Sequence, residues 1–557
     1  LRTAGGTGPQ EGAASMARDH VRAPVAHAPA VPPHAAAGAG TAGSKGHFFP
    51  ARLAAGPWPL AGILLLQAGL SLRLVWSNTA YQDEALYLWA GRQEWAHWLH
   101  GAPAPDFASY FSGAPVIYPP LGALASSIGG LAAARILSLG CMLAATALLY
   151  AVARDLLGRR AAIAGAVAFA VIGPTQFLGA LATFDALALL LLALASWLAV
   201  RPGRSREHRS GERPSGEPGT GGEWGGEQWL VCCAVAMALA DAAKYTSLLW
   251  NPVIIALAVL GRAGPWPRSA RRGVRLAGYT AALIIPAAFL AGGHSYLAGI
   301  MSTTLARPGS TVPVLRVLSH SAEWIGVVAV LAVAGATAVT RKRMGPRLTT
   351  LAWVLAAAAF LAPAAEARIH SDFSLFKHAG YGAWFACIVA GYALAEFARS
   401  LQARPPGYAR LASGLAVIAV TVSGAVLAAG QFAAWPDSAQ MIRGLAPVIG
   451  RTGCPCLIAE NDVVHYYLPE QTTPDAFTTV FVLKYRTAGR ELSGIRAYRA
   501  AIGDHYFRLA EVDPSEMPAV YAPVVRALAA AQYRLVVSTP SNVPGEPFEI
   551  WVQDRDG

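Results

Sequence analysis

Long apolar runs alternate with short polar stretches along most of this 557-residue chain. Residues 161–182 and 186–200 contain no charged side chain. Each run approaches or reaches the roughly 20 residues that cross a bilayer as a helix. The pattern predicts about eleven transmembrane helices, with a short apolar piece at 119–130 lying at the membrane interface. The predicted spans are 57–75, 132–153, 161–178, 185–200, 229–243, 247–260, 276–291, 324–339, 348–364, 381–397 and 411–430.

The composition supports an all-α polytopic membrane protein. Hydrophobic side chains make up 54% of the chain and charged ones only 14%, whereas soluble domains carry about 25% charged residues. The net charge of +12 comes from short basic clusters between apolar runs rather than from a basic patch interleaved with aromatic residues. Such clusters orient membrane helices and do not indicate nucleic acid. They fall at 154–160, 201–213, 262–275, 341–347 and 399–410.

Placing these clusters in the cytoplasm predicts a cytoplasmic N-terminus and an outer C-terminus. Residues 1–50 are rich in Ala, Gly and Pro, which indicates a disordered cytoplasmic tail. The membrane domain then covers 51–430, with a first outer loop at 76–118. Residues 431–557 have a soluble composition and are expected to form a small α/β domain outside the membrane. Its predicted elements are strands at 456–459 and 533–537 and a helix at 519–531, and a flexible insert is predicted at 201–227.

The six cysteines indicate no metal site. Cys454 and Cys456 lie in the outer domain, and their spacing is too tight for an ordinary bridge between the two. We therefore expect free or separately paired thiols, because no second Cys or His pair accompanies them.

Acidic and basic side chains gather on the predicted outer side of the membrane, many of them at the ends of spans. Asp83 and Glu84 directly follow the first span. Acids at a membrane boundary are costly and usually face protein or water for a functional reason. The alternative is that these charges only anchor helix ends, although such anchors are mostly Lys and Arg. The other members of the group are Asp106, Asp185, Asp241, Lys244, His294, Arg307, Glu366, Arg368, His370, Asp372, Lys377 and His378.

A carboxylate that faces several cations is suited to the transfer of a sugar from a lipid-linked sugar phosphate. The cations stabilise the leaving phosphate, and the carboxylate takes the proton of the attacking hydroxyl. The sequence contains no Walker loop, no His-Glu-x-x-His, no Gly-x-Ser-x-Gly and no dinucleotide fingerprint.

Ordered motifs across residues 57–400 resemble the GT-C superfamily of glycosyltransferases. The run Asp83-Glu84-Ala85-Leu86-Tyr87 follows the first span, and Tyr118-Pro119-Pro120-Leu121 ends the first outer loop. Ala134-Arg135-Ile136-Leu137-Ser138, Thr183-Phe184-Asp185-Ala186-Leu187 and Ala243-Lys244-Tyr245-Thr246 continue the series. Within the superfamily, the chain is most similar to the branch of dolichyl-phosphate-mannose–protein mannosyltransferases and bacterial aminoarabinose transferases, glycosyltransferase family 39 and its relatives.

The resemblance implies that Asp83 is the general base. It implies that Glu84 is a second acid, which either orients the acceptor or the loop or binds a metal. A divalent metal is therefore an alternative cofactor. Lys244, with Lys377 and His378, would bind the donor phosphate. Asp185 and Tyr87 are candidate acceptor-binding or positioning residues, and capping of a helix is an equal alternative for Asp185. Arg135, inside a span, needs a partner in any fold.

We therefore expect an inverting glycosyltransferase that uses a polyprenyl-phosphate sugar at the outer face of a plasma membrane, among membrane lipids. The acceptor is a protein or a cell-envelope glycan or lipid. The Ala- and Arg-rich composition favours a bacterial source. The alternative is a transporter or flippase for a lipid-linked or anionic substrate, although transporters usually place charges at the midplane of repeated, broken helices.

Overall fold

The computed structural model describes residues 58–201 and 226–554, apart from short gaps at 263, 291–292, 306, 308–309, 402–405, 472–476, 480–482 and 488. The predicted tail at 1–50 and all but the ends of the predicted insert at 201–227 lie outside the described residues.

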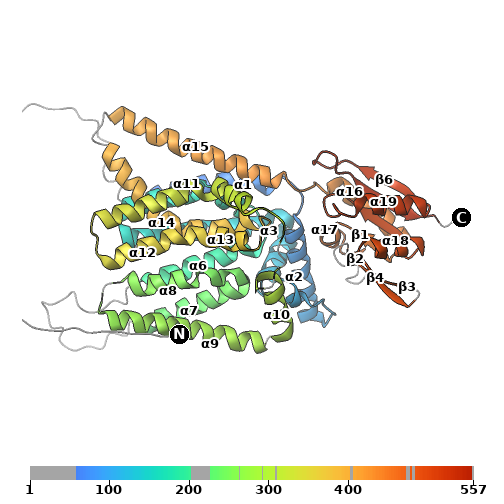
Figure 1. The fold of residues 1–557 in the computed structure, drawn as a ribbon, viewed down its shortest axis with the longest axis horizontal. Coiled ribbons are helices and arrows are strands. Elements are labelled where there is room, and N and C mark those ends of the chain that lie inside the picture. Colours follow the sequence, from blue (N-terminus) through green and yellow to red (C-terminus); the bar gives the residue numbers. More distant parts are fainter. Residues whose placement is uncertain are drawn as a thin grey trace, which may run out of the picture. The chain divides into compact units, whose positions relative to one another are not determined.

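Long apolar helices run side by side through the first part of the described chain (Figure 1). In the described ranges, seven helical segments are long and apolar enough to cross a membrane. The sharply bent pair α9 (Trp266–Leu290) and α10 (Gly293–Ile300) adds an eighth if it counts as one span. The seven are α1 (Trp58–Val75), α3 (Tyr118–Leu157), α7 (Gly226–Ala243), α11 (Val314–Arg341), α12 to α13 (Pro346–Arg368), α14 (Leu375–Leu401) and α15 (Pro406–Phe432).

The other three predicted spans are helical but shorter or broken, which is why the count of long helices falls below eleven. Residues 161–178 form α4 (Arg159–Val171) and α5 (Gly173–Leu178), which divide just before Pro174. Residues 185–200 form α6 (Phe184–Val200), and 247–260 form the 3-10 helix η3 (Tyr245–Trp250) with α8 (Asn251–Leu260). Proline removes a helical hydrogen bond and so favours such breaks. The prediction of a polytopic, mostly helical membrane protein is confirmed.

Two segments differ in detail from the sequence-based expectation. The apolar piece at 119–130 is the first part of α3, which is broken by non-helical backbone at Gly129 and Gly130, where Gly130 has a φ of 64°. The loop expected at 76–118 is largely helical, with α2 (Gln82–His100) and the short η2 (Phe107–Ser109). The backbone N–H of Tyr81 donates to Oε2 of Glu84 at 2.9 Å. This bond satisfies a free donor at the start of α2, which carries Asp83 in its first turn.

Helix α14 forms the centre of the bundle and is buried along most of its length. It packs against α11 and α4. At the α4–α14 crossing, a Cβ on Gly165 would lie 2.5 Å from the Cys387 carbonyl oxygen, and one on Gly391 would lie 2.3 Å from that of Ala161. Small residues let membrane helices approach this closely. The crossing therefore fixes the position of α14, whose first turn contributes to the candidate site.

The C-terminal residues form a small α/β domain, as predicted. Its five-stranded sheet has the order β2-β1-β5-β7-β6. Strands β2, β1 and β5 are parallel to one another, and β7 runs antiparallel to both of its neighbours, β5 and β6. The predicted strands correspond to β1 and β6, and the predicted helix to α19, with Pro523 in its first turn. The strands are β1 (Cys456–Ile458), β2 (Phe477–Thr479), β5 (Leu509–Val512), β6 (Tyr533–Thr539) and β7 (Phe548–Gln553), and β3 (Lys484–Thr487) and β4 (Arg490–Ser493) form a separate hairpin.

Helices cover both faces of this sheet. Alternate residues of β1 point to opposite sides, so Leu457 joins a core with α18 (Ile495–Gly503) and α19 (Tyr521–Ala530), and Ile458 joins one with α16 (Ala439–Thr452). The short α17 (Asn461–Tyr467) follows β1 at the carboxyl end of the parallel strands.

One expectation about the cysteines was wrong. Cys454 and Cys456 form a disulfide with each other, with their Cα atoms 4.6 Å apart, and the peptide between Cys454 and Pro455 is cis. This separation lies within the range that a disulfide spans, although only one residue separates the two cysteines.

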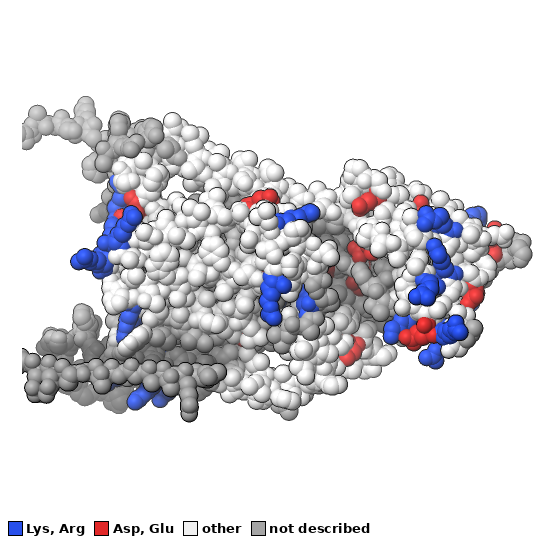
Figure 2. All heavy atoms as spheres, viewed as in Figure 1, with Lys and Arg blue, Asp and Glu red and all other residues white. Residues whose placement is uncertain are grey.

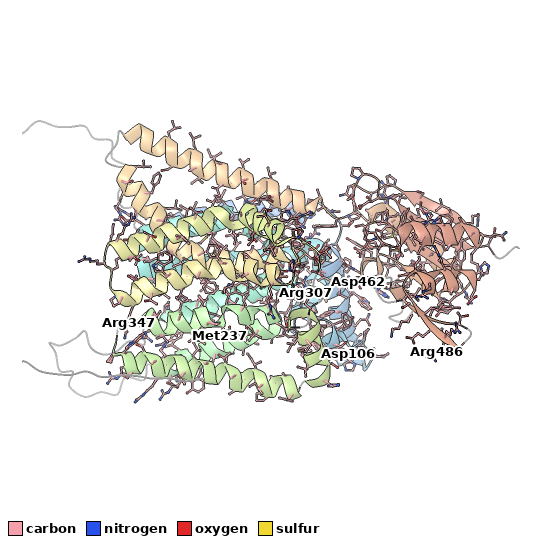
Figure 3. All side chains as sticks on the ribbon, in the orientation of Figure 1. Asp106, Met237, Arg307, Arg347, Asp462 and Arg486 are labelled. Atoms are coloured by element: carbon pink, nitrogen blue, oxygen red, sulfur yellow. A yellow bond between two sulfur atoms is a disulfide. The ribbon has the colours of Figure 1, made fainter. Side chains whose placement is uncertain are left out.

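Charges on the visible face of the helical part are concentrated toward its ends (Figure 2). The wide surface between is mostly free of Lys, Arg, Asp and Glu, as expected of helices that face lipid. Arg347, at the turn between α11 and α12, and Arg307 lie toward opposite ends of the helices in Figure 3.

Candidate functional site

The first turn of α2 opens onto a cavity of about 350 Å³ near one end of the helices. Its walls come from α2, the segment 110–112, the start of η3, the stretch after α10 and the start of α14. The lining side chains that carry charge or can carry it are Asp83, Lys244, Arg307, Lys377 and His378.

Asp83 forms an ion pair with Lys377 across this cavity. Lys377 is almost fully buried, whereas the Asp83 side chain keeps 23% of its surface exposed. The Lys377 ammonium also lies 5.7 Å from the ring centroid of Tyr81 and 5.5 Å from that of Phe376. These contacts hold the cation in place, and they leave part of the carboxylate open to an incoming ligand.

Glu84, the neighbour of Asp83, points away from the cavity and is fully buried. Arg135 donates to it twice, from Nε to Oε1 at 2.9 Å and from Nη2 to Oε2 at 2.6 Å. The backbone N–H of Ala182 adds a bond to Oε1 at 2.6 Å. Arg135 also donates to the carbonyl groups of Val75, Asn78 and Thr79, which end α1 and lead into α2. The pair thus connects α1, α2 and α3 and gives Arg135 the partner that a buried guanidinium needs.

Lys244 reaches the cavity from the turn between α7 and η3. Its ammonium lies 2.8 Å from Oδ1 of Asp185, and both side chains are nearly fully buried. Asp185 lies in the first turn of α6, outside the cavity lining, where Thr183 donates to its Oδ2 at 2.9 Å. Tyr381 of α14 donates to the Asp185 carbonyl oxygen at 3.0 Å. Asp185 therefore orients Lys244 from behind.

Glu366 orients the other two basic side chains of the cavity, His378 and Arg307. Its Oε1 lies 2.8 Å from Nδ1 of His378 and 3.6 Å from Nη1 of Arg307. Arg307 also donates to the Ser374 hydroxyl at 3.4 Å. The cavity thus holds two lysines and an arginine, each beside one carboxylate, and only the carboxylate of Asp83 lines the cavity itself. A phosphate entering here would meet Lys244, Arg307 and Lys377 together.

Tyr87 lies one helical turn after Asp83 and forms part of an aromatic wall. Its ring centroid is 4.3 Å from that of Phe184 and 5.2 Å from that of Phe111. Burial, together with the charges of Asp83 and Asp185, raises the pKa of the Tyr87 hydroxyl well above its usual value, so it remains a neutral hydrogen-bonding group.

The structure brings most of the residues singled out in the sequence to one place. Asp83, Tyr87, Lys244, Lys377 and His378 line the cavity, and Glu84 and Asp185 lie behind it. Sequence reasoning left His294 and Arg307 without a role, and of these two Arg307 lines the cavity. Arg307 sits in a stretch with no recognisable motif, and its only signal was a position on the predicted outer side.

No group of three or more His, Cys, Asp or Glu side chains is arranged to hold a metal ion in the described ranges. Both oxygens of Glu84 already accept hydrogen bonds from Arg135. The surroundings of this carboxylate therefore do not fit a metal ligand.

The C-terminal domain contacts α2 through α17. The His465 ring stacks on that of Trp89 with centroids 4.3 Å apart, and the Tyr467 hydroxyl accepts from the backbone N–H of Ala80 at 3.0 Å. Asp462 of α17 (labelled in Figure 3) is near enough to Asp83 for the charge of Asp83 to affect its pKa. Burial, and then the charge of Asp83, raises the pKa of Asp462 to about 7. The domain therefore contacts the same helix that presents Asp83.

Comparisons with known proteins agree with this architecture. The family model described as dolichyl-phosphate-mannose-protein mannosyltransferase matches residues 116–209. No curated protein matches the chain significantly in sequence.

Several solved structures share the fold. ArnT from Cupriavidus metallidurans in the apo state is similar with a TM-score of 0.57 and 14% identity over 89% of this chain and 98% of ArnT. The same protein bound to undecaprenyl phosphate gives a TM-score of 0.56 and 14% identity over 90% and 98% of the two chains. The Archaeoglobus fulgidus oligosaccharyltransferase tethered to an acceptor peptide gives 0.51 and 13% over 90% of this chain and 74% of that one.

The match to ArnT covers 89% of this chain, which is more than the residues 57–400 that carry the sequence motifs. The chain thus has a GT-C fold with a C-terminal domain, and its resemblance to the mannosyltransferase and ArnT branch of that superfamily is confirmed.

Proposed function

We infer that this protein is an integral-membrane glycosyltransferase that transfers a sugar from a polyprenyl-phosphate donor to an acceptor hydroxyl. One observation carries the proposal. A partly exposed carboxylate, Asp83, shares a cavity with Lys244, Arg307 and Lys377. This is the pairing of a base with phosphate-binding cations that such a transfer needs.

The donor phosphate is expected to bind the three cations and His378. Burial makes charge-assisted hydrogen bonds in such a cavity stronger than they are in water. The name of the matching family model includes dolichyl-phosphate-mannose, and ArnT, which shares the fold, has been solved with undecaprenyl phosphate. Both support a lipid-linked phosphate as the donor of this chain.

Asp83 acts as the general base in this proposal. The acceptor oxygen attacks the anomeric carbon of the sugar as its proton passes to the Asp83 carboxylate. The bond between that carbon and the phosphate oxygen breaks, and the phosphate leaves with its electrons beside Lys244 and Lys377. A single displacement of this kind inverts the configuration at the anomeric carbon. Glu84, Asp185 and Glu366 take no part in proton transfer and hold Arg135 and the cations in position.

We place the reaction at the outer face of a bacterial plasma membrane, with the N-terminus in the cytoplasm and the C-terminal domain outside. The position of one basic cluster supports this orientation. Arg341, Lys342, Arg343 and Arg347 cluster at the α11–α12 turn, at the end of the helices opposite Arg307 (Figure 3). Basic clusters of this kind usually face the cytoplasm.

The proposal is tested by following transfer from a radiolabelled polyprenyl-phosphate sugar in membranes that contain the full chain. We expect the parent and the Asp155→Asn control to transfer label, because Asp155 is a surface residue beside Arg154 at the far end of α3. Asp83→Asn should lower the rate by about 10²–10⁴-fold. Full activity in Asp83→Asn would remove this residue as the base.

The orientation has a separate test. Single cysteines at Trp98 and Met344, both exposed, can be treated with a membrane-impermeant thiol reagent in intact cells. We expect labelling at position 98 and protection at position 344. The reverse pattern would place the cavity in the cytoplasm and exclude an outer-face reaction.

A further inference from the structure

A second, larger cavity of about 560 Å³ adjoins the first. Phe373 lines both, and the chain passes from one to the other at the start of α2, where Gln82 lines the second cavity and Asp83 the first. The C-terminal domain closes this second cavity with Glu460 and with residues 515, 516 and 518. Asp83 thus lies at the boundary between two chambers.

Aromatic rings form much of the wall of the second cavity. The ring centroids of Tyr81 and Trp435 are 5.1 Å apart, and Trp324 and Phe376 lie 6.4 Å apart on another side. Flat apolar surfaces of this kind suit the C–H face of a sugar ring, and the Tyr and Trp edges offer polar groups as well.

The ionisable side chains of the second cavity are mainly acidic, whereas those of the first are mainly basic. Among the described residues that line it, Glu460, Glu516 and Asp372 are acids, and no Lys or Arg is present. The one residue that could become cationic, His320, is bonded to Asp372 at 3.0 Å. The two chambers on either side of Asp83 therefore differ in their lining, which is mainly basic in one and acidic in the other.

Glu460 presents to the second cavity a carboxyl group without a partner among the described residues. Its side chain is more than nine-tenths buried, lines the cavity and forms no hydrogen bond or ion pair with the part of the chain that the structure describes. It follows β1 at the carboxyl end of the parallel strands, a common place for ligands in α/β domains. Glu516 also faces the cavity and receives only a long bond from Gln82 at 3.4 Å. A buried polar group without a partner is costly, so a ligand that donates hydrogen bonds would stabilise this site.

A negatively charged ligand would not fit here. Burial, with the nearby charges of Asp513 and Asp462, raises the pKa of Glu516 to about 8, and burial raises that of Glu460 well above its usual value. The two glutamates therefore mark a place where further negative charge is unfavourable, because burial and the neighbouring carboxylates already oppose their own ionisation. No Lys or Arg lines the cavity to balance the charge of a phosphate, whereas sugar hydroxyls can donate to a carboxylate and accept from a protonated carboxyl group.

We propose that the second cavity is the acceptor site, shared between the membrane helices and the C-terminal domain, and that it receives an uncharged sugar. This proposal rests on the proposed glycosyltransferase function and adds the chemical class of the acceptor. The donor phosphate then occupies the cationic chamber, the acceptor sugar occupies the acidic and aromatic one, and the acceptor hydroxyl reaches Asp83 at the boundary. The acceptor is accordingly a glycan or glycolipid that carries no phosphate on the sugar that is modified.

Saturation-transfer NMR on the full chain in nanodiscs tests this assignment. The probes are the methyl glycosides of mannose, glucose and galactose, each paired with its 6-phosphate. Binding of undecaprenyl phosphate is measured on the same samples as a test of the donor side. The variants are Trp435→Phe, Trp435→Ala and Glu516→Gln, and Glu491→Gln, in the exposed β3–β4 hairpin, is the matched control.

We expect at least one neutral glycoside to give a saturation-transfer signal at least ten times as strong as that of its 6-phosphate. The neutral signal should fall at least fivefold in Trp435→Ala and less in Trp435→Phe. It should stay within about threefold in Glu516→Gln, because the amide also donates and accepts hydrogen bonds. Undecaprenyl phosphate should bind all variants within about threefold, which also shows that they are folded.

Three results would overturn the acceptor site. The first is the absence of signal from every neutral glycoside in a protein that binds undecaprenyl phosphate. The second is equal or tighter binding of a 6-phosphate in the parent. The third is a signal from a neutral glycoside that persists in a folded Trp435→Ala. Failure of the parent to bind undecaprenyl phosphate would instead contradict the proposed function, so the two failures are distinguishable.

Discussion

Two adjacent carboxylates have different surroundings because successive residues of a helix point in different directions. Asp83 faces the cavity and pairs with Lys377, whereas Glu84 is buried against Arg135. The sequence identified both acids and the unusual arginine inside a span. It could not pair Glu84 with Arg135, since their contact joins residues 51 positions apart. The same limit hid Arg307, whose position depends on its contacts with the distant Ser374 and Glu366 rather than on a local motif.

Removal of one partner of the Glu84–Arg135 pair should destabilise the protein. Breaking a buried ion pair costs about 3–5 kcal/mol because the remaining charge has no partner. We expect Glu84→Gln and Arg135→Met each to lower the thermal unfolding temperature of the purified chain, and the double variant to recover part of the loss. An unchanged melting temperature in both single variants would show that the pair does not hold α1, α2 and α3 together.

Arg307 should contribute to binding of the donor phosphate. A hydrogen bond to a charged group is worth about 1.5–3 kcal/mol, which corresponds to roughly 10–150-fold in affinity. We expect Arg307→Ala to weaken undecaprenyl phosphate binding by at least tenfold, as measured by titration in nanodiscs. Arg316→Ala serves as the control, because Arg316 is exposed and lies 3.9 Å from Asp372, outside the cationic cavity. Equal affinities in the two variants would remove Arg307 from the donor site.

At the scale of the elements, the apolar pattern predicted the long helices because each must present about 20 apolar residues to lipid. It located α1, α7 and α11 well, and it also found the α/β composition of the C-terminal domain. The pattern could not show that α5 and α8 begin at proline breaks, or that the loop before α3 is folded as α2. The proline breaks are local and leave the hydropathy of each run unchanged. The folding of the loop depends on tertiary contacts, such as the bonds that Arg135 makes to the chain between α1 and α2.

The α4–α14 crossing should tolerate no side chain at Gly391. A Cβ there would lie 2.3 Å from the Ala161 carbonyl oxygen, so the backbones would have to move apart. We expect Gly391→Ala to lower the unfolding temperature and to reduce transfer, because α14 carries Lys377 and His378. Gly140→Ala is the matched control, since a Cβ at Gly140 meets nothing within 4 Å and alanine favours a helix. Similar stability in both variants would refute the close crossing.

At the scale of the whole molecule, the C-terminal domain completes the region around Asp83 rather than standing apart from it. It contacts α2 through α17, and its Glu460 and Glu516 line the second cavity. The sequence predicted the domain and its fold class, but no motif linked it to the membrane site. That link arises only because the carboxyl ends of β1 and β5 face the start of α2, where Gln82 donates to Glu516.

The packing of this domain should make stability depend on pH. The folded-state pKa of Glu516 is raised to about 8 by burial and by Asp513, Asp462 and Asp83, against about 4.3 in an unfolded chain. Since the unfolded state loses its proton first, the contribution of this group is full below about pH 4 and is lost as pH rises toward 8. We expect the thermal unfolding temperature of the full chain to fall over this window and to fall less steeply in Glu516→Gln. Identical pH profiles would contradict the burial of this carboxyl in the folded protein.

The most direct test of the central claim measures donor binding and sugar transfer on the same preparation of Asp83→Asn. If Asp83 is the base in a cationic cavity, the variant binds undecaprenyl phosphate within about threefold of the parent, while its transfer rate falls by about 10²-fold or more. Transfer at the rate of the parent, or a loss of binding as large as the loss of transfer, would contradict the account.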